Sequence, residues 1–153
     1  MADVLQGKLI GVTINGEFVN CQVDATLTLN VATEETDPCK PAPGESSANA
    51  SWAKPTVGTR SGTVDFSIKT FATNTGFNQA DISEIIIDGD AKTEWQFMTI
   101  QTTDYDHEEA WVYSGEGIFT SQSIAAPSTG ESTSDTSIVM YDKPTIVRTP
   151  ITT

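Results

Sequence analysis

The chain has 153 residues, a length that suits one domain with a hydrophobic core of ordinary size. It is strongly acidic, with 21 Asp and Glu against 8 Lys and Arg and a net charge of -13, and no Lys or Arg occurs between Lys92 and Lys143. Such a surface repels nucleic-acid phosphates and anionic lipids, which excludes DNA binding through a basic patch. The N-terminal residues MADVLQGKLIGV lack a secretory signal, and no apolar run reaches the roughly 18 residues of a membrane span. We therefore expect a protein that is made in the cytoplasm and has no membrane anchor.

The first part of the chain alternates apolar and polar residues with period two, as β-strands do. Residues 8–14 form one such segment and end at the turn-like sequence Ile14-Asn15-Gly16-Glu17, so we predict a hairpin with the next strand. That strand is long and spans residues 18–31. Its apolar positions are Cys21, Val23, Ala25, Leu27, Leu29 and Val31. Its polar positions are Gln22, Asp24, Thr26, Thr28 and Asn30. The pattern predicts one dry face and one wet face.

The two cysteines, Cys21 and Cys39, do not form a CxxC pair. Cys21 falls on the apolar phase of the long strand. We expect reduced, structural thiols, with a disulfide as the alternative.

Residues 32–61 interrupt the alternation with several prolines and a Ser/Ala/Asn run. A structureless loop of this length is uncommon in a compact domain and favours a segment that is functional or ordered by a partner. Trp52 is a large apolar side chain in this polar segment, which suggests an anchor to a partner. We therefore predict an interaction loop at 32–61 that includes Trp52, Pro55 and Arg60.

Alternation resumes at Gly62. The apolar positions are Val64, Phe66 and Ile68, and the polar positions opposite them are Thr63, Asp65, Ser67 and Lys69. This pattern predicts a second strand with one polar face.

A single helix is predicted after this strand. Asn78 is a suitable N-cap, and Asp81 follows three residues later. The spacing of Ile82, Ile85 and Ile86 predicts a short amphipathic helix that ends at Asp88-Gly89 and lies on a sheet.

The remaining chain favours strands at 93–101, 110–124, 134–141 and 145–151, the first two joined as a hairpin by an acidic turn at 103–109. The total is about seven strands and one helix in a single domain, 1–153. We predict a mainly β fold, a β-sandwich or partial barrel with one short flanking helix.

The strand at 110–124 contains Gly115 and Gly117, which weaken a strand because glycine adds backbone entropy and packs nothing. We predict that they mark a strand bend where another backbone approaches closely. Trp111, Tyr113 and Phe119 share one phase, which we assign to packing.

The acidic turn is the best candidate for a metal site, because Asp104, Asp106 and Glu108 could offer oxygen ligands to Ca²⁺. The EF-hand pattern fails, however, and acidic residues at a hairpin tip are commonly just solvated. We predict no metal and no cofactor, with this turn as the weak alternative. The only histidine, His107, lies in the same turn, where nothing would exclude water, so we predict that the protein is not an enzyme.

Several of these features together resemble the major tail proteins of long-tailed bacteriophages, the tail-tube family, and in particular the lactococcal-phage type. They are an N-terminal hairpin, a long loop with Trp52 followed by GTRSGTVDFSI, one short helix, and the YSGEGIFTSQSIAAP strand. The resemblance covers residues 7–140.

The resemblance implies a subunit that contributes hairpins to a shared hexameric β-barrel, with rings stacked into a conduit for DNA. The polar positions of the two long strands, Gln22, Asp24, Thr26, Thr28, Asn30, Thr63, Asp65 and Ser67, would face the lumen. DNA would pass without specific binding. Lys69 is the exception, because it would place a positive charge on that wall. The partners would be the protein itself and tape-measure, tail-tip and tail-terminator proteins, in a virion tail assembled in the host cytoplasm.

Two alternatives remain. Trp52, Trp95 and Trp111 could form the aromatic platform of a carbohydrate-binding β-sandwich. A head or tail virion protein that does not polymerise, such as a head-decoration or terminator protein, is the other.

Overall fold

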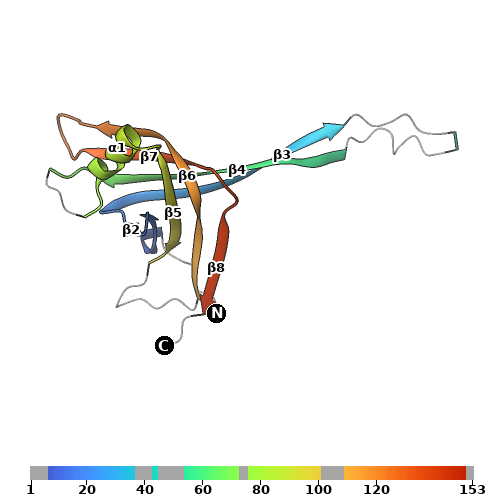
Figure 1. Cartoon of the computed structure of the whole chain (residues 1–153), viewed down its shortest axis with the longest axis horizontal. Helices are drawn as coiled ribbons and strands as arrows, with labels where there is room; N and C mark the ends of the chain where they lie inside the picture. Colours follow the sequence, from blue (N-terminus) through green and yellow to red (C-terminus); the bar gives the residue numbers. More distant parts are fainter. Residues whose placement is uncertain (1–6, 37–42, 45–53, 73–75, 101–108, 151–153) are drawn as a thin grey trace. The chain divides into compact units, whose positions relative to one another are not determined.

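The computed structural model describes residues 7–36, 43–44, 54–72, 76–100 and 109–150 (Figure 1). It divides into two compact units. The first, which we call the main unit, comprises Met1–Thr28 and Thr63–Thr153, and the second, the hairpin unit, comprises Leu29–Gly62. The main unit holds the helix and the core.

The fold is mainly β, as predicted. A 3-10 turn (Gly7–Leu9) precedes eight strands and one helix in the described residues: β1 (Ile10–Ile14), β2 (Glu17–Phe18), β3 (Gln22–Thr36), β4 (Lys54–Lys69), α1 (Gln79–Asp88), β5 (Lys92–Thr99), β6 (Glu109–Ala125), β7 (Thr133–Met140) and β8 (Thr145–Pro150). They form one sheet in the order β2-β1-β5-β6-β7-β4-β3, with β8 paired to β6 off this path.

The core forms where the alternating strands place their apolar positions. Val64, Phe66 and Ile68 of β4 are buried, as their phase predicted, and they join Trp95 of β5 and Ile138 of β7 in one cluster. The aromatic phase of β6 packs against this cluster as well, with Phe119 buried and Trp111 and Tyr113 partly buried.

Helix α1 begins where the sequence predicted. The Asn78 side chain accepts a hydrogen bond from Ala80 N at 3.0 Å, and Asp81 Oδ2 accepts one from Asn78 N at 2.9 Å, which completes a capping box. Ile82 is the buried contact of the helix with the core. The amide of Gln122 on β6 donates to Gln79 O at 3.0 Å and so ties the helix to the sheet.

The strand at 110–124 pairs with 93–101 as predicted, since β5 and β6 are antiparallel with Trp95 opposite Gly115. The N-terminal prediction was only partly right. The turn after Ile14 does make a hairpin, but its second strand, β2, has only two residues, and the long strand β3 pairs with β4 instead. The reason is that Cys21 takes a left-handed backbone conformation (φ 53°) and breaks the strand before Gln22.

Three predictions for the first third of the chain are corrected. Cys21 is an exposed free thiol in that turn, not a strand residue on an apolar face. The dry face of β3 is partly buried only at Ala25 and Leu27, whereas Val23, Leu29 and Val31 are exposed. The interruption at 32–61 is narrower than predicted, because β3 continues to Thr36 and β4 begins at Lys54.

The hairpin unit consists, in its described part, of the adjoining ends of β3 and β4. Thr56 Oγ1 donates to Glu34 O at 3.1 Å, and Gly58 lies against Ala32 O. These contacts run in opposite order along the two strands, so the pair is antiparallel.

Candidate functional site

A polar surface crosses four neighbouring strands of the main unit in the order β6-β7-β4-β3. It surrounds an open depression of about 320 Å³. Carboxylates and hydroxyls make up this surface, which we call the polar face: Asp24, Thr26, Asp65, Ser67, Ser121, Ser123, Asp135 and Ser137.

The strand register explains why these side chains meet. Asp65 on β4 lies opposite Ser137 on β7, which lies opposite Ser121 on β6. Ser67, Asp135 and Ser123 form the next row. Since residues opposite one another in paired strands point to the same side, each row presents its polar groups together.

A β-bulge brings β6 into these rows. The register between β6 and β7 shifts between Phe119 and Ser121, so one residue is added and the phase of the strand reverses. Phe119 therefore points into the core, while Ser121 and Ser123 join the polar face. Gln122 points the other way, toward α1.

The polar face is acidic. Its carboxylates are Asp24, Asp65 and Asp135, of which Asp135 accepts a hydrogen bond from Ser67 Oγ. No cationic side chain lines the depression among the described residues. Asp and Ser at these positions make a wettable surface that repels anions.

Lys69 lies at the end of β4, in phase with Asp65 and Ser67. Its Nζ is 2.9 Å from Glu131 Oε2 in the segment between β6 and β7. The hydrogen bond to Glu131 and the charge of that carboxylate raise the pKa of Lys69 above its ordinary value of 10.5. Both side chains are exposed, so this is a surface ion pair.

Of the residues predicted for the wet face, Asp24, Thr26, Asp65 and Ser67 lie on the polar face. Thr63 and Thr28 are partly buried on the same strands, and Asn30 is exposed in the hairpin unit.

Gln22 does not belong to this set. Its amide donates to Val12 O at 2.7 Å and to Val19 O at 3.0 Å and accepts from Val12 N at 2.7 Å. The amide side chain therefore satisfies backbone groups of Val12 and Val19, a role that periodicity could not predict.

Half of the polar face was not predicted from the sequence: Ser121, Ser123, Asp135 and Ser137. A signal for the two β7 residues was present in TSDTSIVM, where Ser134, Thr136 and Ile138 are buried and alternate with the polar face. The β6 residues could not be assigned in this way, because the bulge reverses their phase.

The predicted interaction loop is described only in part. Pro55 and Arg60 are exposed on β4 in the hairpin unit, while Trp52 lies outside the described residues. Their role in contacts with a partner stays a prediction.

Gly115 and Gly117 lie where β6 changes partners. Up to Ser114 it pairs with β8, and from Gly117 on it pairs with β7. A Cβ on Gly117 would lie 2.4 Å from Ile138 Cγ2, and one on Gly115 would lie 3.2 Å from Trp95 Cζ2. Backbone atoms approach closely as well, with Val139 O 3.0 Å from a Cβ on Gly117 and Pro144 Cα 3.4 Å from one on Gly115. These contacts lie within this chain, and a contact of the glycines with a second copy stays a prediction.

The aromatic platform of the carbohydrate-binding alternative is not formed. Trp95 has no exposed surface. Trp111 stacks on Phe97 with ring centroids 6.1 Å apart and meets Tyr113 edge-on at 5.2 Å. These rings serve packing, which is the commoner fate of tryptophans in paired strands.

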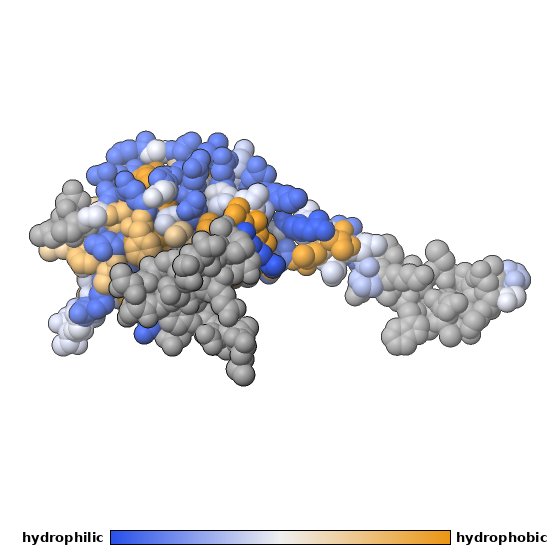
Figure 2. Space-filling model, turned by 90° about the horizontal axis from the view of Figure 1, so that it is seen from below, coloured by the Kyte–Doolittle hydropathy of each residue, from blue (hydrophilic) through white to orange (hydrophobic). Residues whose placement is uncertain are grey.

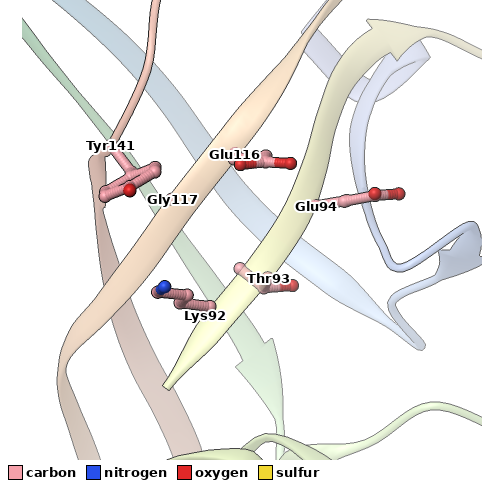
Figure 3. Close-up of a pocket in the computed structure, with 6 residues that line it drawn as sticks. All are labelled: Lys92, Thr93, Glu94, Glu116, Gly117 and Tyr141. Atoms are coloured by element: carbon pink, nitrogen blue, oxygen red, sulfur yellow. The ribbon is translucent and has the colours of Figure 1, made fainter. Parts of the chain in front are cut away.

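A second depression, of about 210 Å³, lies over β5 and β6 near the end of β7 (Figure 3). Glu94 and Glu116 face each other across the two strands, and Lys92 Nζ lies 5.2 Å from the centroid of the Tyr141 ring. Among the described residues, no hydrogen bond or ion pair joins Lys92, Thr93 or Tyr141 to the carboxylate of Glu94 or Glu116, so a nucleophile paired with a base is not formed.

The residues described here contain no group of three or more His, Cys, Asp or Glu side chains suited to a metal ion. The predicted weak alternative, Asp104, Asp106 and Glu108, lies outside them. No described helix is long and apolar enough to cross a membrane.

No protein-family model matches the sequence, and no curated protein matches it. Solved structures do match the fold. The tail of an empty gene transfer agent particle with C6 symmetry aligns at 15% identity and a TM-score of 0.69, over 94% of this chain and 99% of that one. The tube-terminating cap of the anti-feeding prophage aligns at 16% identity and a TM-score of 0.67, over 96% of this chain and 93% of that one. The SPP1 tail tube aligns at 6% identity and a TM-score of 0.61, over 97% of this chain and 80% of that one.

These alignments span nearly the whole chain, and at such low identities they establish the fold. The chain therefore has the fold of tail-tube and tube-terminating proteins, the fold that the sequence resemblance implied.

Proposed function

We propose that the chain is a structural subunit of a virion tail that assembles into hexameric rings, that these rings stack into a tube, and that the polar face lines its lumen. The observation that carries the proposal is the continuity of the polar face over β6, β7, β4 and β3. The described part of the chain offers no comparable arrangement for a catalytic role.

The two ends of this four-stranded surface support ring formation. β3 is the last strand of the sheet, and residues 120–125 of β6 pair only with β7 among the described strands. Open strand edges are a liability in a monomer, and pairing with another chain removes it. Because the two edges differ, pairing one with the other is a head-to-tail contact, which closes into a ring when the rotation fits.

The charge of the polar face supports a lumen wall. A passing DNA would meet the carboxylates of Asp24, Asp65 and Asp135, which repel phosphates and offer no binding site. Lys69 at the end of this surface lies beside Glu131, whose negative charge offsets its own. The tube would thus let DNA pass without holding it, with tape-measure, tail-tip and tail-terminator proteins as its other partners.

Negative-stain microscopy of the purified protein tests the proposal. Long hollow tubes are expected as the protein is concentrated. Monomers without rings at any concentration, even with purified tail-tip protein added as a nucleus, would contradict it.

A second candidate function is a tube terminator, favoured by the similarity to the anti-feeding prophage cap. A terminator would form single rings that do not stack. The same micrographs therefore separate the two functions.

A further inference from the structure

Strand β8 presents apolar side chains on both of its faces. Ile146 and Val147 are 55% and 54% exposed, and as consecutive strand residues they point to opposite sides. β8 pairs with residues 109–114 of β6 along one edge, and its other edge has no partner among the described strands. A strand that exposes both faces and one edge is suited to pairing with a further strand.

The charge of this region is opposite to that of the chain. β8 itself contains Arg148 and no acidic residue, in a protein of net charge -13. Lys143 lies just before the strand, where Asp142 Oδ1 accepts a hydrogen bond from Lys143 N at 2.7 Å. Both cations are exposed, and neither forms an ion pair with a described residue. The chemistry that fits β8 is therefore an apolar strand with acidic residues.

The hairpin unit carries a strand of this kind. Leu29 and Val31 on β3 are each 54% exposed, and Val57 on β4 is 62% exposed. Residues 29–36, LNVATEET, contain Glu34 and Glu35 and no basic residue. Figure 2 shows apolar residues, in orange, reaching the surface of the molecule.

We propose that β8 is a docking strand for residues 29–36 of a second copy of this chain. This inference rests on the proposed function and assigns a contact between subunits that the ring closure does not use. The free edge of β6 is short, residues 120–125, so ring closure needs only part of the 15-residue strand β3. We assign residues 22–28 to that contact, which leaves residues 29–36 for a second one. Antiparallel pairing with Val31 opposite Ile146 would cover both of these side chains and would set Lys143 opposite Glu34.

Charge favours this occupant over a second β8. Two β8 strands side by side would set Lys143 and Arg148 against the same cations of the partner. Such a contact is also isologous and would end at a dimer.

Cysteine cross-linking of two variants tests the proposal. Both carry Cys21→Ser and Cys39→Ser to remove the native thiols, one with Val31→Cys and the other with Ile146→Cys. After mixing and mild oxidation, we expect disulfide dimers between the two variants at least tenfold above dimers of either variant with itself. Equal yields of the three dimers would overturn the proposal.

A charge exchange is the second arm. Lys143→Glu should reduce the mixed-variant cross-link at least tenfold, and Glu34→Lys on the other chain should restore it. The matched control, Lys8→Glu, reverses an exposed cation outside β8 and should leave the yield unchanged. Failure of the restoring pair would contradict docking by these strands.

The two proposals can fail separately. Mixed cross-links without tubes in the micrographs would leave β8 docking intact and refute the stacked tube. Tubes without mixed cross-links would refute β8 docking and leave the stacked tube intact.

Discussion

Gly117→Ala tests whether the glycines of β6 serve the core of this chain. The added Cβ would lie 2.4 Å from Ile138 Cγ2, 3.0 Å from Val139 O and 3.1 Å from Trp95 Cδ1. All three neighbours belong to paired strands in the core region, so none can move away freely. We expect a loss of about 1–3 kcal/mol in the free energy of unfolding, the usual cost of overpacking a core.

Two matched variants calibrate this value. Gly115→Ala places its Cβ 3.2 Å from Trp95 Cζ2, so it should cost less, about 1 kcal/mol or below. Gly7→Ala adds a Cβ with no atom within 4 Å. Its free energy of unfolding should therefore stay within about 0.5 kcal/mol of the wild-type value.

A double mutant tests the contact itself. Ile138→Leu removes the γ2 methyl that the new Cβ would strike, so the loss for Gly117→Ala with Ile138→Leu should fall short of the sum of the single losses by about 1 kcal/mol. Urea unfolding followed by tryptophan fluorescence, at a concentration where the protein is monomeric, gives these values. A stable Gly117→Ala protein that fails only in assembly would refute this reasoning and return the glycines to a subunit contact.

Asp65→Lys should still allow tubes but slow the release of DNA from particles, whereas Glu84→Lys on the exposed side of α1 should not, and equal release rates for both would contradict the lumen assignment. Asn78→Ala should lower the free energy of unfolding by about 1 kcal/mol, because the helix cap is lost. Asn78→Asp keeps a capping oxygen and should keep most of that stability, and thermal melts of both variants would measure the difference. Trp52→Ala should give a folded monomer that polymerises poorly by light scattering, and loss of the monomer fold would instead make Trp52 a core residue.

The sequence predicted local features well. The alternation at 63–69 gave the buried and exposed phases of β4 because a strand with one dry face must repeat every two residues. The capping box at Asn78 and Asp81 gave the start of α1, since all of its contacts lie within four residues.

Pairing between distant strands was harder to predict. Periodicity assigns a phase but not a neighbour, so nothing in residues 22–36 indicated that β3 lies beside β4 and not beside β1. The bulge after Phe119 hid Ser121 and Ser123, because it shifts the phase inside a strand that otherwise alternates. The left-handed turn at Cys21 was missed for a similar reason, since the residue fits the apolar phase of the strand that follows.

The apolar residues of β3 illustrate a limit of a different kind. Leu29 and Val31 continue the alternation that is partly buried at Ala25 and Leu27, yet they are exposed in the hairpin unit. The pattern indicates a surface to be covered, and in an assembling protein the cover can come from another copy.

The central claim is that the polar face lines the lumen of a tube made of this chain. Cryo-electron microscopy of the assembled protein tests it most directly. We predict stacked hexameric rings with Asp24, Asp65 and Asp135 on the inner wall. A ring or tube that carries these carboxylates on its outer surface would contradict the claim.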